Sequence, residues 1–369
     1  MAVLADAGCT TTRQATRPDG PVEHVQMEPM QVIARRTPHG TVIETRDAMS
    51  LFRAGGDAFQ DGRYAEAAAA YSVLLAEFPA STYSDAARYN LGLALEKAGR
   101  IAEAITAFQQ VVAHGADPKD AIDATFRIAG CYEALKDWER VEQTLHGLRE
   151  RQDLTDENRV EADVRLGMAY LHRDQLDEAE ARFRAVLRRN KTGPPRPLLP
   201  SDRFLAQAQY GVSRVEHRRF SLRSIRLPQE LMDQDVQEKA RTFLRAQAAY
   251  LRAMGYKDRY WSSASGLKVG ALYEDFYNDL MTAPVPKELN AEEVEVYFEE
   301  LRKVIRPLVE RAIYVYEKNA RLAEGLGPES EVLQETRDRL ERLRKFVDPK
   351  DEEPPAAPPQ TSPEAPGTG

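Results

Sequence analysis

The sequence predicts an all-α protein whose central part is a solenoid of stacked helical pairs. The main observation is a pattern that occurs four times between Leu51 and Leu187, with copies 37, 37 and 38 residues apart. Each copy has a small residue, a bulky residue, an alanine and a second bulky residue at fixed offsets, except that the looser third copy has Val141 in place of the alanine. A unit of this length cannot bury its apolar face alone, so neighbouring units must stack into one core. The copies are Gly55, Tyr64, Ala67 and Tyr71; Gly92, Ile101, Ala104 and Phe108; Ala129, Trp138, Val141 and Leu145; and Gly167, Leu176, Ala179 and Phe183.

Composition supports a folded chain. Of the 369 residues, 42% are hydrophobic and 30% are charged, which is enough apolar material for a core. No run of 18 or more apolar residues occurs, so no helix is expected to cross a bilayer. The two cysteines cannot form a disulfide framework, and Cys131 is expected to be a small buried residue of a repeat helix.

The sequence divides into four expected segments. The repeat units each comprise a first helix, a turn and a second helix, and the turns contain Gly62, Gly99, Asp137 and Asp174. A proline-rich connector precedes a fifth, degenerate unit, whose second helix is expected to be lost around Leu227-Pro228. The segments are a flexible N-terminal segment over 1–46, a repeat solenoid over 47–226, a helical C-terminal region over 227–347 and a disordered proline-rich tail over 348–369.

Three local signals refine these segments. Two β-prone runs, 30–36 and 41–46, indicate a small hairpin in the N-terminal segment. In the C-terminal region, helices are expected over about 229–254 and 261–281. A third helix should begin after Asn290, where Glu293 completes a capping box.

The surroundings of Cys9 are typical of a lipid-modification site. Small residues, Ala7 and Gly8, precede this cysteine, and a polar stretch follows it, as at the processing site of a bacterial lipoprotein. Asp6 stands where that pattern has an aliphatic residue, and only eight residues precede Cys9. Either the start is mis-assigned and Cys9 carries a lipid that tethers the protein to a membrane surface, or Cys9 is incidental in a flexible N-terminus.

The repeat offsets resemble those of the tetratricopeptide repeat (TPR), whose period is about 34 residues. The stretch from Ala76 to Gly92 (AEFPASTYSDAARYNLG) is similar to the repeat joints of bacterial envelope proteins of this superfamily, namely outer-membrane assembly lipoproteins and cell-division coordinators. Residues 268–319 resemble the C-terminal region of TPR lipoproteins of a gliding-motility machine. The resemblance implies a right-handed superhelical TPR solenoid, followed here by an irregular helical C-terminal bundle.

No catalytic signature was found. The six histidines lack metal-ligand spacing, and neither a phosphate-binding glycine loop nor a nucleophile elbow is present. The sequence therefore predicts a protein that is not an enzyme and has no cofactor, metal or small-molecule substrate. Partner proteins are expected in the inner groove formed by the first helix of each unit. The groove residues outside the repeat pattern are Arg53, Asp57, Gln60, Arg88, Asn90, Glu96, Arg127, Glu133, Arg165 and His172.

A strongly basic segment runs from Arg182 to Arg226. It carries twelve basic and two acidic residues, although the whole chain has a net charge of −8. It could contact an acidic protein surface, anionic lipid or nucleic acid, or it could neutralise acidic faces within the molecule. Nucleic acid is the least favoured partner, because aromatic residues are not interleaved with the arginines. The expected basic patch comprises Arg188, Arg189, Lys191, Arg218, Arg219, Arg223 and Arg226.

An aromatic group near Gly255 is a further candidate surface. Tyr256, Tyr260 and Trp261 could anchor a partner, or they could pack into the core of the C-terminal bundle. Together these features favour a scaffold for protein–protein interactions in a bacterial cell envelope, on the periplasmic face of the outer membrane if the start is mis-assigned. The alternative is a cytosolic TPR regulatory module that binds acidic partners through the basic segment.

Overall fold

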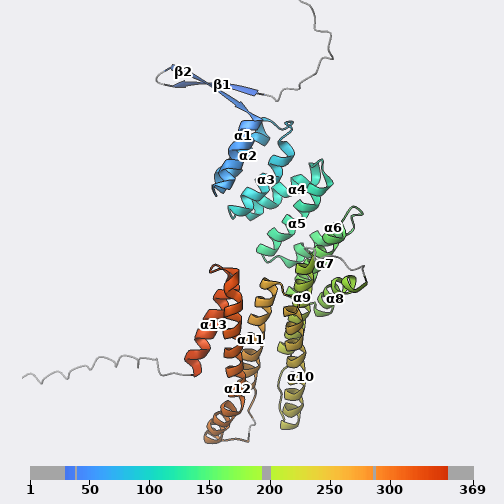
Figure 1. Ribbon diagram of the computed structural model, residues 1–369, viewed down its shortest axis with the longest axis vertical. Coiled ribbons are helices and arrows are strands. Elements are labelled where there is room, and N and C mark those ends of the chain that lie inside the picture. The colour runs from blue at the N-terminus through green and yellow to red at the C-terminus, as the bar shows by residue number, and fades with distance from the viewer. Residues whose placement is uncertain (1–29, 38–39, 193–200, 286–287, 348–369) are drawn as a thin grey trace, which may run out of the picture. The chain divides into compact units, whose positions relative to one another are not determined.

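The computed structural model describes residues 30–37, 40–192, 201–285 and 288–347 (Figure 1). Helices dominate the described residues, and the chain divides into two compact units, Met1–Arg100 and Ile101–Gly369. The predicted all-α fold of stacked helical pairs is confirmed. None of the described helices is both long and apolar enough to span a membrane.

The first unit begins with the expected hairpin. Strand β1 (Met30–Thr37) pairs antiparallel with β2 (Gly40–Asp47), in a register that runs from Met30 opposite Asp47 to Thr37 opposite Gly40. Asp47 then caps α1, because its carboxylate accepts a hydrogen bond from the backbone N–H of Ser50 at 2.7 Å. The hairpin therefore leads directly into the first repeat helix.

Three helices complete the first unit: α1 (Ala48–Gln60), α2 (Tyr64–Glu77) and α3 (Ser84–Lys97). The ring of Tyr71 on α2 lies directly against Gly55 on α1, where an added Cβ would be 2.7 Å from the ring. This contact explains the first small residue of the repeat pattern. Only glycine lets the aromatic ring of the second helix approach the first helix so closely.

The second unit contains the remaining repeat helices. Val141 and Leu145 are fully buried, so the third copy packs well although it lacks the alanine of the other copies. Consecutive helices pack against each other from α4 to α10. These helices are α4 (Ile101–His114), α5 (Pro118–Ala134), α6 (Trp138–Arg149), α7 (Asp156–His172), α8 (Leu176–Thr192), α9 (Ser201–Ser221) and α10 (Gln229–Met254).

One turn prediction needs correction. Gly62, Gly99 and Asp174 adopt the left-handed conformation that a tight reversal needs, as expected. In the third turn, however, Lys136 has the positive φ of 57°, and Asp137 does not. Asp137 instead caps α6, because its carboxylate accepts a hydrogen bond from the backbone N–H of Arg140.

The helix expected over about 229–254 is present as α10, but it lies where the second helix of the fifth unit was expected to be lost. Pro228 ends the connecting loop and is the N-cap of α10, which packs along α9 as its partner. Proline fixes φ and has no N–H to leave unsatisfied, so it is compatible with a helix start as well as with a break. The fifth unit is therefore a complete helical pair.

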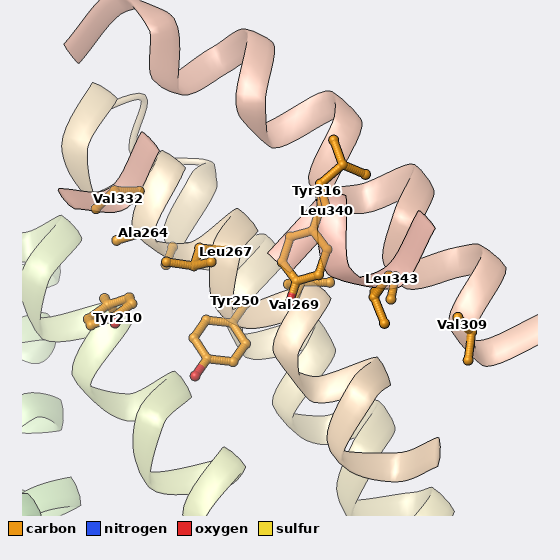
Figure 2. Packing of buried hydrophobic residues seen from close by; sticks show 12 residues of the cluster. Tyr210, Tyr250, Ala264, Leu267, Val269, Val309, Tyr316, Val332, Leu340 and Leu343 are labelled. Carbon is orange, nitrogen blue, oxygen red and sulfur yellow. The ribbon is translucent and has the colours of Figure 1, made fainter. Parts of the chain in front are cut away.

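The C-terminal bundle contains α11 (Arg259–Met281), α12 (Ala291–Ala323) and α13 (Glu331–Val347), with a short 3₁₀ turn at Glu324–Leu326 between the last two. The capping box of Asn290 and Glu293 at the start of α12 is confirmed. A buried cluster drawn from α9 to α13 forms the core of this bundle (Figure 2). Its labelled members are Tyr210, Tyr250, Ala264, Leu267, Val269, Val309, Tyr316, Val332, Leu340 and Leu343.

Helices α11 and α12 approach each other closely. Gly270 on α11 faces the ring of Tyr316, and Gly266, one turn earlier, faces the amide of Asn319. An added Cβ would be 2.2 Å from the nearest atom in each case, so neither position has room for a side chain. This packing fixes the side chains of α11 beside those of α9 and α13, where the polar site described below is formed.

Candidate functional site

The expected groove residues of the first unit differ in their surroundings. Arg53, Asp57 and Gln60 on α1 are exposed and occupy positions i, i+4 and i+7, so they share one face of the helix. Within the described residues, their side chains make no hydrogen bond or ion pair. Arg88 on α3 instead forms an ion pair with Asp85 at 2.6 Å.

The other two groove candidates of the first unit are half-buried. Asn90 on α3 forms a hydrogen bond with Tyr71, although burial still raises the pKa of that phenol. Glu96 is also half-buried, and it makes contacts within the fold. The exposed polar face of the first unit therefore lies on α1.

In the second unit, Arg165 on α7 bridges to α5. Its guanidinium donates a hydrogen bond to the carbonyl of Phe126 at 2.9 Å and lies 3.8 Å from Glu133 and 3.0 Å from Glu161. Burial raises the pKa of Glu133, and the charge of Arg165 partly offsets that effect. Arg127 is exposed on α5. Of the predicted groove residues of α5 and α7, Glu133 and Arg165 thus lie together and form a polar strip with Glu161.

The basic segment is largely paired within the molecule. Arg218 forms a two-pronged ion pair with Asp174 of the preceding unit, with both N–O distances at 2.7 Å. Arg219 contacts three carboxylates at 2.6–3.4 Å, and Arg226 contacts Asp235 at 2.8 Å. Arg188 and Arg223 are exposed. The carboxylates around Arg219 belong to Asp177, Glu180 and Glu216.

These ion pairs support the intramolecular interpretation of the basic segment for Arg218, Arg219 and Arg226. The side chains of Arg189 and Lys191 lie outside the described residues, as does the lipidation candidate Cys9.

The aromatic candidates do not form one surface. Tyr260 is 46% exposed, whereas Trp261 packs against Tyr210 with ring centres 5.1 Å apart and belongs to the edge of the buried cluster. Tyr256 is half-buried. Tyr260 is therefore the only exposed residue of the three.

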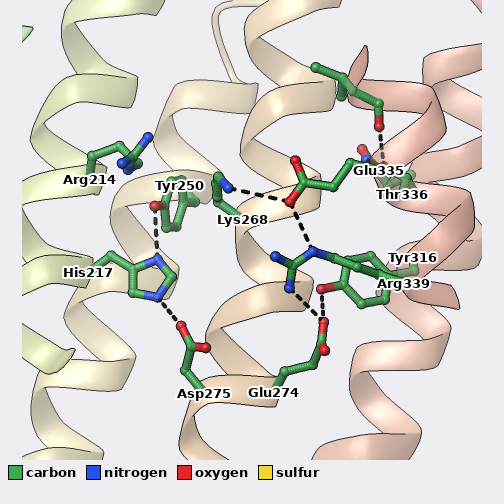
Figure 3. Close-up of polar contacts among 12 residues, drawn as sticks. Arg214, His217, Tyr250, Lys268, Glu274, Asp275, Tyr316, Glu335, Thr336 and Arg339 are labelled. Carbon is green, nitrogen blue, oxygen red and sulfur yellow. Dashed lines mark hydrogen bonds and ion pairs between the residues drawn. The ribbon is translucent and has the colours of Figure 1, made fainter. Parts of the chain in front are cut away.

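A polar pocket of about 350 Å³ lies among α7, α9, α11 and α13, and the sequence did not indicate it. His172, the last groove candidate, lies at its edge, and its ring is stacked on Trp138 with ring centres 3.9 Å apart. The charged lining residues are Asp174, Arg214, Arg218, Lys268, Asp275 and Arg339. Figure 3 shows Arg214 and His217 on α9 opposite Lys268 and Asp275 on α11.

Most charges around this pocket are paired. The ring of His217 bridges the hydroxyl of Tyr250 at 3.1 Å and the carboxylate of Asp275 at 2.9 Å. Arg339 contacts Glu335 at 2.9 Å and Glu274 at 3.2 Å, and Lys268 lies 3.8 Å from Glu335 (Figure 3).

Arg214 differs from these groups. Within the described residues it has no carboxylate within 4 Å and contacts only the ring and hydroxyl of Tyr210, the latter at 3.4 Å. Its charge affects two neighbours. The pKa of Lys268 is lowered by burial and further by Arg214 and Arg339, against the opposing effect of Glu335. The pKa of His172 is lowered by burial and by Arg214. The pocket therefore has a positive potential around Arg214.

The residues present can hold or orient a polar group, but they do not form a metal site. Within the described ranges, no three His, Cys, Asp or Glu side chains converge as metal ligands would. The pocket residues come from four helices that are far apart in the sequence, so no local motif could have revealed them. Arg214 and Arg218 belonged to a segment that the charge pattern had marked, but nothing in that pattern placed them at a pocket.

Comparison with known proteins agrees with the repeat pattern. Residues 52–121 and 89–140 match the family model described as tetratricopeptide repeat. Together with the helical pairs, this match shows that the chain has an all-α TPR fold and supports its place in the TPR superfamily. No curated protein matches the chain.

Several solved structures are similar. A tetratricopeptide repeat protein from Parabacteroides merdae has 16% identity and a TM-score of 0.39, over 80% of this chain and 98% of that chain. The C-terminal part of a TPR repeat-containing protein from Cytophaga hutchinsonii has 11% identity and a TM-score of 0.42, over 82% and 96%. YrrB, a TPR protein with an unusual peptide-binding site, has 18% identity and a TM-score of 0.36, over 57% and 92%.

Proposed function

We propose that this protein is a non-enzymatic adaptor that holds a segment of a partner protein against the first helices of its repeats. The observation that carries the proposal is the exposed polar face of α1. Arg53, Asp57 and Gln60 follow one another along about 10 Å of helix, and their side chains have no partner among the described residues. A TPR fold uses such helix faces to present side chains rather than to pack its own core.

The polar strip of α5 and α7 extends the same proposal to the second unit. There the guanidinium of Arg165 lies beside Glu133 and Glu161, which hold it in place. A pre-ordered arginine loses less conformational entropy when it contacts a partner, so this strip would contribute to affinity.

The test compares two variants of the full chain in its native host. Replacing Arg53, Asp57 and Gln60 by alanine should reduce partner recovery in an affinity purification quantified by mass spectrometry. The matched control is Ser72→Ala, because Ser72 is exposed on the second helix of the same pair. Equal recovery with both variants would contradict the role of the α1 face.

The proposal extends to location. The order of residues around Cys9, together with the resemblance of residues 76–92 and 268–319 to envelope proteins, supports a lipid-anchored component of a bacterial cell-envelope complex. Such a complex would be of the outer-membrane or gliding-motility type. Labelling the native host with a fatty-acid analogue should mark the wild-type protein and leave Cys9→Ser unmarked. Recovery of an unlabelled protein that retains Met1 in the cytosol would contradict this location.

A further inference from the structure

We propose that the pocket among α7, α9, α11 and α13 binds a single carboxylate group, held by Arg214 and Lys268. The inference goes beyond the adaptor function, because its key residues lie outside the polar faces of α1, α5 and α7. It depends on the charge balance of the pocket, on the buried setting of its cations and on the space that the pocket leaves open.

The charge balance of the pocket indicates that the ligand is negatively charged. Around the pocket, the four lining cations and the neighbouring Arg342 face four carboxylates, so one positive charge is in excess when both histidines are neutral. The distances assign that excess to Arg214, the group without a carboxylate nearby. The cations are Arg214, Arg218, Lys268, Arg339 and Arg342, and the carboxylates are Asp174, Asp275, Glu274 and Glu335.

The surroundings of Arg214 leave room for a direct anionic partner. The guanidinium lies over the ring of Tyr210, 5.9 Å from the ring centre, and Tyr210 is itself buried. Among the described residues, Glu335 acts on the charge of Arg214 only from beyond contact distance, so an anion that enters the pocket would be its first direct carboxylate contact. Lys268 faces Arg214 across the pocket and has only a long 3.8 Å contact with Glu335, so its ammonium can join the same anion (Figure 3).

The single surplus positive charge favours an anion with one negative charge. One surplus charge matches a carboxylate, whereas a phosphate dianion would leave a second negative charge beside Asp174 and Asp275. Arginine also matches the planar carboxylate with two parallel hydrogen bonds. The open volume of about 350 Å³ accommodates the carboxylate together with a short attached chain. The carboxylate could belong to a small acid or to the end of a peptide, which share this chemistry.

The experiment uses the full chain and two small probes, N-acetylglycylglycine and its C-terminal amide, with binding followed by isothermal titration calorimetry. The free acid should bind and the amide should not, because only the acid carries the charge. Arg214→Gln should weaken binding of the acid by about tenfold or more, since it removes a charged partner. Arg203→Gln is the matched control on the same helix, because Arg203 is exposed outside the pocket and should leave binding unchanged.

A second variant and further ligands provide independent tests of the proposal. If Arg214→Gln melts at a much lower temperature than the wild type, Lys268→Met provides the second test and should also weaken binding. Longer peptides with a free carboxyl end, compared with the small acid, distinguish the two sources of the carboxylate. No binding of the acid at millimolar concentration, equal binding of acid and amide, or tighter binding of inorganic phosphate would each overturn the proposal.

Discussion

The ring of Phe183 on α8 lies against Gly211 on α9 so closely that an added Cβ would be 2.4 Å from the ring. Phe183 is fully buried and also contacts Gly167 on α7, so one aromatic ring fills the space between the first helices of two successive units. The repeat pattern therefore reflects a physical requirement, namely a bulky side chain on each second helix and small residues opposite it.

The contact between Phe183 and Gly211 predicts that Gly211→Ala destabilises the fold. The new methyl group must displace the buried ring, and overpacking of this kind costs about 1–3 kcal/mol. Gly147→Ala is the matched control, since Gly147 lies in a helix with nothing within 4 Å of an added Cβ. It should raise stability by up to about 1 kcal/mol through helix propensity. Urea denaturation followed by circular dichroism measures both, and a neutral Gly211→Ala would contradict the packing described.

The buried side chain of Lys239 predicts a second substitution that strongly destabilises the fold. Its side chain is 1% exposed, and its ammonium contacts the carbonyls of Phe220 and Arg223 at 3.2 and 2.6 Å and the carboxylate of Asp279 at 2.7 Å. Lys239→Met keeps the apolar stem but removes the ammonium from the carbonyl of Arg223 and the carboxylate of Asp279, which should cost about 3–5 kcal/mol.

The matched control for Lys239→Met is Arg241→Met, because Arg241 is an exposed cation on the same helix. Thermal melts should show a large drop in melting temperature for Lys239→Met and little change for Arg241→Met. Equal melting temperatures for the two variants would mean that the buried ammonium does not stabilise the fold.

The contacts of the buried Glu274 carboxylate predict that two substitutions at this site lower stability by different amounts. It accepts hydrogen bonds from the hydroxyl of Tyr316 and from Arg339 and Arg342. Burial, followed by the nearby charge of Glu274, raises the pKa of Tyr316, so the phenol stays protonated as a donor. Glu274→Gln should cost about 2–3 kcal/mol, because Arg342 loses its anion and Arg339 keeps only Glu335.

Tyr316→Phe is the milder matched variant at this site. It removes one hydrogen bond and should cost about 1–2 kcal/mol of unfolding free energy. Equilibrium unfolding in urea measures the free energy of unfolding of both variants and shows which one is less stable. A Glu274→Gln protein as stable as Tyr316→Phe would show that the carboxylate has no structural role.

The ion pair of Asp174 and Arg218 predicts a dependence on pH and salt. Its hydrogen bond to Arg218 lowers the pKa of Asp174 below its usual value. The pair therefore contributes stability that is complete above about pH 4 and is lost as the pH falls through the lower, folded-state pKa. Because both side chains are largely exposed, Arg218→Gln should cost less than about 1 kcal/mol at neutral pH.

Thermal melts of wild type and Arg218→Gln at pH 7 and pH 2.5, each at low and high salt, measure this contribution. The difference in melting temperature should be largest at pH 7 in low salt and should become smaller at pH 2.5. A difference that stays equally large in acid would mean that Arg218 stabilises the fold without Asp174.

The sequence predicted the repeats well because their packing depends on local spacing. The positions of Gly55 and Tyr71 are fixed by one helical pair, so their offset is visible in the chain itself. The helix that begins after Pro228 was expected, but its pairing with α9 was not, because that pairing depends on tertiary packing. In the same way, Lys136 and not Asp137 took the left-handed turn position, since Asp137 gains more as a helix cap.

The candidate site was less predictable. The charge count marked Arg214 and Arg218 as part of one basic segment, but it could not show that Asp174 pairs with Arg218 while Arg214 has no carboxylate partner within the described ranges. That distinction depends on the packing of α7, α11 and α13 around α9. Nothing in the sequence indicated that Lys268 and Arg339 line the pocket, because only the tertiary fold brings these two residues together.

The central claim, that the first helices of the repeats receive a partner, is tested most directly by site-specific photo-crosslinking in the native host. A photoreactive amino acid would replace Asp57 on α1 or, as the matched control, Ser72 on α2, both of which are exposed. The adaptor account predicts a discrete crosslinked partner from position 57 and none from position 72. Crosslinks of equal yield from both positions, or from position 72 alone, would contradict it.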